Sequence, residues 1–260
     1  MSEERPETGD GADAAPTVDA ASSTADAEPG FLGYLGAALK EVALVLVMAM
    51  VLSFVVKTWL IQAFYIPSGS MEDTLLVGDR VVVSKLTPGP IDLERGDVVV
   101  FQDPGGWLDT VPLPERTGLS GAVHDLLVFV GLLPSESEDH LIKRVIGLPG
   151  DRVSCCDSQG RLLVNGRAID ETYVRPGDEP SSLEFDITVP EGRVWVMGDH
   201  RSDSEDSRYH DPGGTGAQGS VPIPDVTGRA VGIVWPFERF SWLSDHAEVF
   251  ADVPDPGSGL

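Results

Sequence analysis

The sequence predicts a mostly β protein, in which an antiparallel β-sheet domain with a small β-ribbon extension follows one transmembrane α-helix. Near the start of the chain, an uncharged apolar run covers residues 42–56. Beyond residue 61, apolar residues come in short runs rich in β-branched side chains, and Gly, Pro and Asp separate these runs. A long apolar run predicts a membrane helix, whereas short punctuated runs predict strands.

The chain begins with an acidic segment. Residues 1–30 are rich in Ala, Glu, Asp, Ser, Thr, Pro and Gly, so we expect a disordered tail that buries too little apolar surface to offset its ordering entropy. No basic region leads into an apolar one here, and we expect no cleavable targeting signal. The whole chain has 18 basic and 42 acidic residues, a formal charge of −24. This balance argues against a nucleic-acid partner, because phosphate binding needs a basic face.

We predict a transmembrane helix over residues 31–61. Its uncharged centre is Val42–Val56, and apolar residues extend it on both sides to about the 20 residues that cross a bilayer. Lys40 and Lys57 could reach the lipid headgroups from its two ends. A buried core helix is the alternative, because the uncharged centre is short. Basic residues are nearly balanced on the two sides, so charge does not determine the orientation.

A β-rich domain is predicted over residues 62–251, and a loose tail over residues 252–260. The expected strands are Asp79–Ser84, Asp97–Phe101, Leu141–Ile146, Arg152–Cys155, Arg161–Val164, Leu183–Val189, Arg193–Met197 and Ala230–Trp235. Residues 104–139 interrupt the β pattern as a loop-like insertion, with a short apolar helix expected at residues 122–133. That helix is too short to span a membrane.

A small β extension is expected at about residues 155–192. Within it, Asn165-Gly166 lies between two short strand-like runs and predicts a hairpin. The only cysteines, Cys155 and Cys156, are neighbours, which excludes a framework of disulfides. Two packed thiols, a vicinal disulfide and a redox-sensitive turn all fit this pattern.

The first stretch that could carry chemistry is residues 66–71, with the sequence IPSGSM, directly after the predicted helix. Pro67 and Gly69 constrain the backbone around two serines. A hydroxyl on such a turn can project into a cleft, and nearby backbone N–H groups can face a developing oxyanion. The same residues also occur in plain loops, so this stretch alone does not separate the two interpretations.

The second stretch is residues 142–151, IKRVIGLPGD. Strand alternation places Lys143 on the same face as Leu141 and Val145. Apolar surroundings lower the pKa of a lysine, so that the neutral amine can accept a proton near pH 7. The alternative is a lysine on a solvated face beside Arg144.

The third stretch is residues 197–208, MGDHRSDSEDSR. Its Ser and Asp side chains can hydrogen-bond the backbone and build an ordered loop, and Asp206 could pair with Arg208. A cation site is the rival interpretation. However, Arg201 stands where an EF-hand loop has its third-position ligand, and His200 has no metalloprotease motif around it. We expect no metal.

Together these stretches closely resemble the type I signal peptidase family, of the bacterial Ser/Lys type. The resemblance covers the membrane helix and most of residues 60–240. It rests on motifs in the family's order, at residues 67–71 (PSGSM), 74–79 (TLLVGD), 95–101 (RGDVVVF), 143–151 (KRVIGLPGD) and 197–208. It implies a membrane-bound serine endopeptidase that removes signal peptides from exported preproteins, with no cofactor.

The resemblance also implies roles for individual residues. Ser70 matches the nucleophile and Lys143 the general base. Ser68 matches the side-chain donor to the oxyanion, working with the Ser70 backbone N–H, and Ser204 matches the serine that orients the lysine amine. The supporting ion pair would be Asp206 and Arg208, and the lining of the small-residue substrate pockets would be Phe64, Ile66, Met71, Leu75 and Ile142.

Two positions depart from the family pattern. The family's Met is followed by a variable residue and then proline, whereas Met71 is followed by Glu72 and Asp73. The family's usual Asn after Gly-Asp is His200 in this chain. Neither position carries the chemistry in the family, so both bear on the shape of the loops.

The resemblance places the protein in the plasma membrane as a single-pass protein, with a cytoplasmic N-terminus and an extracytoplasmic β domain. Signal-peptide-bearing preproteins and the lipid bilayer would be its partners. Even a fully extended chain from Val56 to Ser70 reaches only about 50 Å, which would hold the site near the bilayer surface. The aromatic residues Trp235, Phe237, Phe240 and Trp242 could contact the interface or pack inside the β domain.

Two alternatives to a Ser/Lys peptidase are open. A Ser-His-Asp hydrolase could use His200 or His210 as its base. An inert, membrane-tethered β domain could bind peptides without cleaving them. The self-cleaving repressors, which also use Ser and Lys, are disfavoured by the membrane helix and by the lack of a helical DNA-binding domain.

Overall fold

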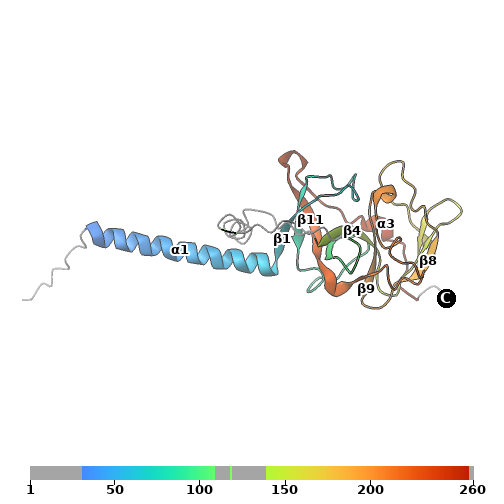
Figure 1. Cartoon of the computed structure of the whole chain (residues 1–260), viewed down its shortest axis with the longest axis horizontal. Helices are drawn as coiled ribbons and strands as arrows, with labels where there is room; N and C mark the ends of the chain where they lie inside the picture. Colours follow the sequence, from blue (N-terminus) through green and yellow to red (C-terminus); the bar gives the residue numbers. More distant parts are fainter. Residues whose placement is uncertain (1–30, 109–117, 119–138, 258–260) are drawn as a thin grey trace, which may run out of the picture. The chain divides into compact units, whose positions relative to one another are not determined.

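The computed structural model describes residues 31–108, 118 and 139–257 (Figure 1). The predicted acidic tail at residues 1–30 and the helix predicted at residues 122–133 lie outside the described residues.

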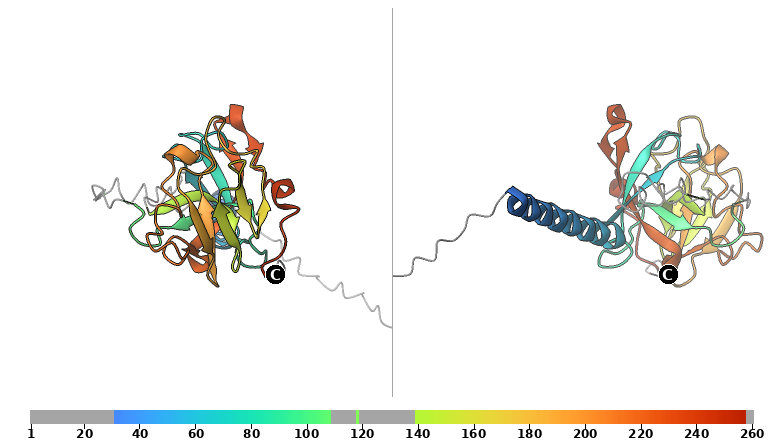
Figure 2. Two further views of the ribbon diagram at one scale, coloured as in Figure 1. Left: turned by 90° about the vertical axis from the view of Figure 1, so that its right-hand side faces the viewer. Right: turned by 60° about the vertical axis from the view of Figure 1, so that its left-hand side comes forward.

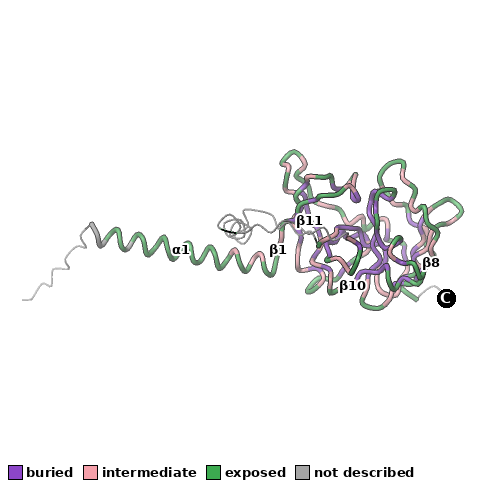
Figure 3. Tube along the Cα trace, viewed as in Figure 1, coloured by how far each residue is buried: buried purple, intermediate pink, exposed green. Residues whose placement is uncertain are grey.

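A single long helix, α1 (Phe31–Trp59), forms over the predicted membrane segment. From Tyr34 to Trp59 it is long and apolar enough to cross a membrane, with a mean hydropathy of 2.4. Its described residues are exposed along almost its whole length (Figure 3). The alternative of a buried core helix is therefore wrong. The helix ends earlier than predicted, because Ile61 already belongs to the first strand.

The β domain is built on an eight-stranded sheet in the order β1-β2-β11-β3-β4-β9-β10, with β12 paired to β11. These strands are β1 (Ile61–Tyr65), β2 (Arg80–Ser84), β3 (Val98–Gln102), β4 (His140–Gly147), β9 (Arg193–Met197), β10 (Val221–Pro222), β11 (Val226–Trp235) and β12 (Ser241–Trp242). Every pairing is antiparallel, which confirms the predicted fold class. The sequence prediction lacks β1, whose apolar residues continue those of α1, and the very short β10 and β12.

Strand β4 lies between β3 and β9 and is buried on both faces. Ile142 packs with Phe64 and Val81 in one apolar cluster, and Val145 packs with Val196 in another. A strand covered on both sides does not show alternating apolar and polar residues. Because β4 is central and covered on both faces, polar side chains on this strand are surrounded by buried residues.

A second antiparallel sheet, in the order β7-β6-β5-β8, forms the predicted small extension. Its strands are β5 (Arg152–Cys155), β6 (Leu162–Val164), β7 (Arg167–Ala168) and β8 (Phe185–Thr188). The turn between β6 and β7 has Asn165 at φ 51° and Gly166 at φ 77°. Left-handed backbone at both central positions is what a tight hairpin of this kind requires, so the hairpin prediction is confirmed.

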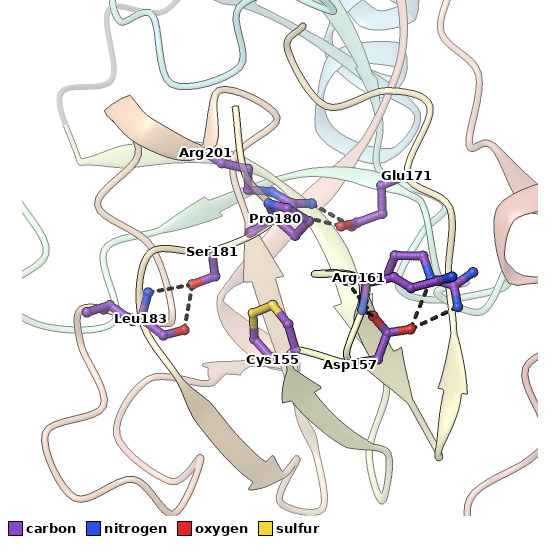
Figure 4. The surroundings of a disulfide bond; sticks show 10 residues. Cys155, Asp157, Arg161, Glu171, Pro180, Ser181, Leu183 and Arg201 are labelled. Carbon is purple, nitrogen blue, oxygen red and sulfur yellow. Dashed lines mark hydrogen bonds and ion pairs between the residues drawn. A yellow bond between two sulfur atoms is a disulfide. The ribbon is translucent and has the colours of Figure 1, made fainter. Parts of the chain in front are cut away.

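The neighbouring cysteines lie at the end of β5. The structure joins Cys155 to Cys156 by a disulfide (Figure 4), so the interpretation as two packed thiols is wrong. Directly after it, Arg161 pairs with Asp157 at 2.8 Å across the turn that leads into β6.

A loose tail is predicted at residues 252–260, but the described part of it, residues 252–257, is tied to the extension. Phe250 and Val253 are buried in the apolar cluster of the extension. The Asn165 side-chain amide donates to the Pro254 carbonyl at 2.8 Å. Apolar burial and this hydrogen bond hold the segment, and chain ends are ordered where such contacts tie them down. Within the described residues, the domain has the short helices η1 (Arg201–Asp203), η2 (Ile223–Asp225), η3 (Phe237–Arg239) and α3 (Ala247–Phe250).

A hairpin made by the end of β11, η3 and β12 projects from the body of the β domain (Figure 2). It carries Trp235, Phe237, Phe240 and Trp242, which are 44%, 72%, 59% and 77% exposed. The alternative in which these aromatic residues pack inside the β domain is wrong.

Candidate active site

The loop that carries Ser70 links β1 to β2 and is closed at its base. The Ile66 N–H donates to the Asp79 carbonyl, and the Gly78 N–H donates to the Ile66 carbonyl, both at 2.9 Å. Ile66 and Met71, on either side of the two serines, are buried. The apolar side chains on both sides fix the turn, so Ser70 is presented from an anchored loop.

Lys143 approaches Ser70 from β4. Its Nζ atom lies 2.5 Å from Ser70 Oγ, and the lysine is only 4% exposed. The alternative of a lysine on a solvated face is therefore wrong, because β4 is covered on both sides. The arrangement brings a hydroxyl and an amine within hydrogen-bonding distance and away from solvent.

Burial lowers the pKa of the Lys143 amine from 10.5 to about 8. The cost of desolvating the ammonium is the main cause. The negative charges of Asp206 and Asp199 oppose the shift, and the positive charge of Arg208 adds to it. A substantial fraction of the amine is thus neutral, and able to accept a proton, at slightly alkaline pH.

Two groups that are able to donate hydrogen bonds belong to the serine turn. Ser68 Oγ lies 3.5 Å from Ser70 Oγ. The second donor is the Ser70 backbone N–H, for which no protein acceptor is found within the described ranges. A side-chain hydroxyl and a backbone N–H at one place can stabilise an oxyanion.

A buried ion pair supports this region from the third motif. Arg208 Nε and Nη2 donate to the two carboxylate oxygens of Asp206, each at 2.8 Å. Burial alone would raise the pKa of Asp206, but hydrogen bonds from Arg208, Gly198 N–H and Ser204 outweigh it and lower the pKa. The Ser204 hydroxyl donates to Asp206 at 2.8 Å. Its orienting role toward the lysine amine stays a prediction.

A second buried ion pair, which the sequence interpretation missed, lies beside the dyad. Arg144 Nε and Nη2 donate to Asp199 Oδ1 and Oδ2 at 2.9 and 2.6 Å. Thr74 donates to the same carboxylate at 2.6 Å, and the Arg144 guanidinium lies 4.2 Å from the centre of the Tyr173 ring. Arg144 adjoins Lys143 in its motif. The sequence contains one indication of this pair: Arg144 lies in the second motif and Asp199 in the third, and their charges are opposite.

The chain is similar in sequence to a family of known proteins. The model of the family described as signal peptidase, peptidase S26, matches residues 39–235. The chain belongs to the signal peptidase family. It is 38% identical to a probable signal peptidase I of Mycobacterium leprae over 233 residues, with 78% of each chain covered. It is 40% identical to a signal peptidase I of Mycobacterium tuberculosis over 220 residues, covering 78% of this chain and 74% of that one.

A signal peptidase I from Enterococcus faecalis V583, for which a crystal structure is known, is 25% identical in sequence to this signal peptidase. The match covers 54% of this chain and 97% of that chain, with a TM-score of 0.33.

The residues predicted to line the substrate pockets lie together in this signal peptidase. They are buried in a single apolar cluster and comprise Phe64, Ile66, Met71, Leu75 and Ile142. Two of them immediately flank the serine turn in sequence, and Ile142 precedes the lysine. Their contact with substrate stays a prediction.

The histidines proposed for a Ser-His-Asp hydrolase are engaged elsewhere. His210 Nδ1 lies 2.9 Å from the Asp206 carbonyl oxygen, and its ring stacks on Trp107. His200 contacts the Gly69 carbonyl. Among the described residues, the hydrogen-bond partners of Ser70 Oγ are Lys143 and Ser68, which favours the Ser/Lys arrangement.

Two acidic residues of the third motif face arginines of the protein itself. Asp199 pairs with Arg144, and Asp206 pairs with Arg208. Over the part of the chain that the structure describes, no group of three metal-ligating side chains is found.

The first departure from the family pattern changes the loop after the nucleophile. Asp73 has φ 90°, whereas proline holds φ near −65°. The proline that usually follows at this position could not adopt this backbone. The loop therefore differs in shape while Ser70 and Lys143 still meet.

Proposed function

We propose that this member of the signal peptidase family is a membrane-bound serine endopeptidase that removes signal peptides from exported preproteins. Ser70 is the nucleophile and Lys143 the general base. One observation carries the proposal: a buried lysine amine with a lowered pKa lies 2.5 Å from a serine hydroxyl on an anchored turn. A lysine whose pKa is lowered by burial is, in its neutral form, a competent base for a serine.

In the first half of the reaction, the neutral Lys143 amine takes the proton from Ser70 as Oγ attacks the scissile carbonyl. The oxyanion accepts hydrogen bonds from Ser68 and the Ser70 N–H. The Lys143 ammonium then gives its proton to the leaving amine of the mature protein, and an acyl-enzyme remains. In the second half, Lys143 takes a proton from water as the water oxygen attacks the acyl carbonyl. The Lys143 ammonium then returns this proton to Ser70 Oγ as the ester bond breaks, and the signal peptide leaves as a carboxylic acid that ionises in solvent.

The lipid bilayer is the proposed surface on which this occurs. Helix α1 has the length and hydropathy to span it, and the hairpin carrying Phe237 and Trp242 exposes aromatic side chains that suit the interface. We place the β domain on the extracytoplasmic side and the N-terminus in the cytoplasm. The apolar core of a signal peptide lies in the bilayer with its cleavage site close by, so enzyme and substrate meet at one depth.

The decisive experiment mixes the full chain in lipid vesicles with a preprotein and sequences the new N-terminus. Cleavage should occur after the signal peptide. Ser70→Ala and Lys143→Ala should each lower kcat by at least about 10³-fold, because the two groups act as a unit. Ser158→Ala and Lys85→Ala are matched controls outside the site and should cleave normally. The two site variants should unfold at the wild-type temperature. Processing by either of them at the wild-type rate would contradict the assignment.

A further inference from the structure

His200 contacts both peptide units that flank the nucleophile. Its backbone N–H donates to the Ser70 carbonyl at 3.1 Å, and its ring Nδ1 lies 3.2 Å from the Gly69 carbonyl oxygen. The Glu72 N–H donates to the same Gly69 oxygen at 2.9 Å. His200 is 8% exposed. His200, which stands where the family usually has Asn, is thus buried next to the turn that carries Ser70.

The contacts of the His200 ring define its tautomer. A carbonyl oxygen can only accept, so Nδ1 must carry the hydrogen that points to Gly69. In a neutral ring Nε2 then has a lone pair, and Arg175 Nη1 lies 2.7 Å from it as the donor. The nearest carboxylate oxygen to Nδ1 belongs to Glu72 and is 3.7 Å away, beyond hydrogen-bonding distance. Arg175 therefore holds the ring in the form that donates to Gly69.

The Gly69 carbonyl and the Ser70 N–H belong to one peptide unit. A trans peptide is planar, and its C=O and N–H point in opposite directions. A hydrogen bond that fixes the Gly69 oxygen therefore also fixes the direction of the Ser70 N–H. Polarising the carbonyl strengthens the N–H as a donor, since linked hydrogen bonds reinforce one another.

We infer that His200 is a positioning residue that aims the Ser70 backbone N–H at the oxyanion, with Arg175 setting its tautomer. The inference rests on the proposed function, in which that N–H stabilises the transition state. It extends the site to the loop before β8, from which Arg175 comes. Arg175 is also tied to the third motif by its own backbone, whose N–H donates to the Asp199 carbonyl at 3.0 Å.

The main test compares His200→Ala with His200→Asn in the vesicle assay. Oxyanion interactions form mainly in the transition state, so His200→Ala should lower kcat by about 10- to 100-fold and change KM by less than about twofold. The Asn amide can still donate to the Gly69 carbonyl, and His200→Asn should recover most of the lost kcat. His246→Ala, at a half-buried histidine outside the catalytic turn, is the matched control and should match the wild type.

A double-mutant cycle tests whether His200 acts on the oxyanion. Substitutions of residues that serve one interaction have effects that are not additive in free energy. The loss of kcat in the double variant His200→Ala, Ser68→Ala should therefore be smaller than the product of the two single losses. A purely structural role would give a lower unfolding temperature, a raised KM and independent effects. Unchanged kcat in His200→Ala, or an Asn variant no better than Ala, would overturn the inference.

Arg175→Met provides a second variant in case His200→Ala does not fold, since the Arg175 side chain is 44% exposed. It should lower kcat by several-fold in the wild-type background and have no effect beside His200→Asn, which has no Nε2 to bind. The ¹⁵N resonances of the His200 ring should show Nδ1 protonated in the wild type. An Nε2-protonated ring would overturn the inference.

The proposed function and the inference fail in different ways. A wild type that cleaves no preprotein refutes both. A wild type that cleaves, with an inactive Ser70→Ala variant and a fully active His200→Ala variant, refutes the inference alone.

Discussion

At the scale of single residues, the protonation state of Lys143 decides how much enzyme can act. Three carboxylates nearby, Asp199, Asp203 and Asp206, favour the charged amine, yet burial outweighs them and lowers its pKa to about 8. Much of this negative charge is already compensated, since Asp199 and Asp206 are paired with arginines. The paired arginines thus leave desolvation as the dominant influence on the amine.

The pH profile of kcat/KM should report this pKa. Only the neutral amine accepts the Ser70 proton, so activity should fall as pH drops below about 8 and level off above it. Between pH 7 and pH 9 the neutral fraction, and with it kcat/KM, should rise about tenfold. Initial rates on a preprotein across pH 4 to 10 measure it. A profile that stays flat down to pH 4 would exclude Lys143 as the base.

The backbone conformation of Asp73 leads to a prediction about stability. At φ 90° a side chain with a Cβ is strained, whereas glycine is not. Asp73→Gly should raise stability by about 1 kcal/mol, and Asp73→Pro should lower it by more than about 2 kcal/mol, as measured by thermal unfolding. Asp73→Ala keeps the Cβ and is the matched control, with no gain expected. A proline variant as stable as the wild type would show that the loop readily changes shape.

At the scale of elements, the site depends on how closely the loop after β9 approaches the serine loop. At Gly198 the backbone passes the Ser70 carbonyl and the Ser204 hydroxyl, and a Cβ built there would collide with both. Only glycine permits this approach, which also lets the next residues, Asp199 and His200, reach their partners.

Gly198→Ala should therefore separate the two loops. Small shifts of reacting groups cost about 100-fold in rate, so we expect a loss of that order in kcat. Stability should fall by about 1–3 kcal/mol from overpacking. Gly213→Ala is the matched control, because its nearest neighbours would be 3.8 Å from the new Cβ, and it should behave as wild type. An active, stable Gly198→Ala variant would show that the loops are not held by this contact.

The elements also show what the sequence could and could not predict. Strands bounded by Gly, Pro and Asp were predictable, and Arg152–Cys155 matches β5 in full. The burial of Lys143 was not, because alternation along one strand does not reveal that apolar clusters pack on both faces of β4. The pairing of Arg144 with Asp199 was equally hidden, since only the order of strands in the sheet brings these residues together. The dyad itself came from the resemblance of the motifs.

At the scale of the whole molecule, a chain with a formal charge of −24 nevertheless exposes two large apolar surfaces. One is the length of α1, and the other is the hairpin with Phe237 and Trp242. Exposed apolar surface of this extent marks a binding face. Aromatic side chains favour the boundary between lipid and water, so the bilayer is the partner that we propose for both surfaces.

The hairpin should therefore insert its aromatic tip into lipid. In full-length variants that keep one tryptophan each, lipids brominated along their acyl chains should quench the fluorescence of Trp242 strongly. Trp107, which is buried in the β domain, should be quenched little and is the matched control. Phe237→Ser with Trp242→Ser should slow cleavage of a vesicle-inserted preprotein several-fold and leave cleavage of a soluble peptide unchanged, because the hairpin does not contribute to the dyad. Equal quenching of both tryptophans, or an equal loss on both substrates, would contradict a lipid-facing hairpin.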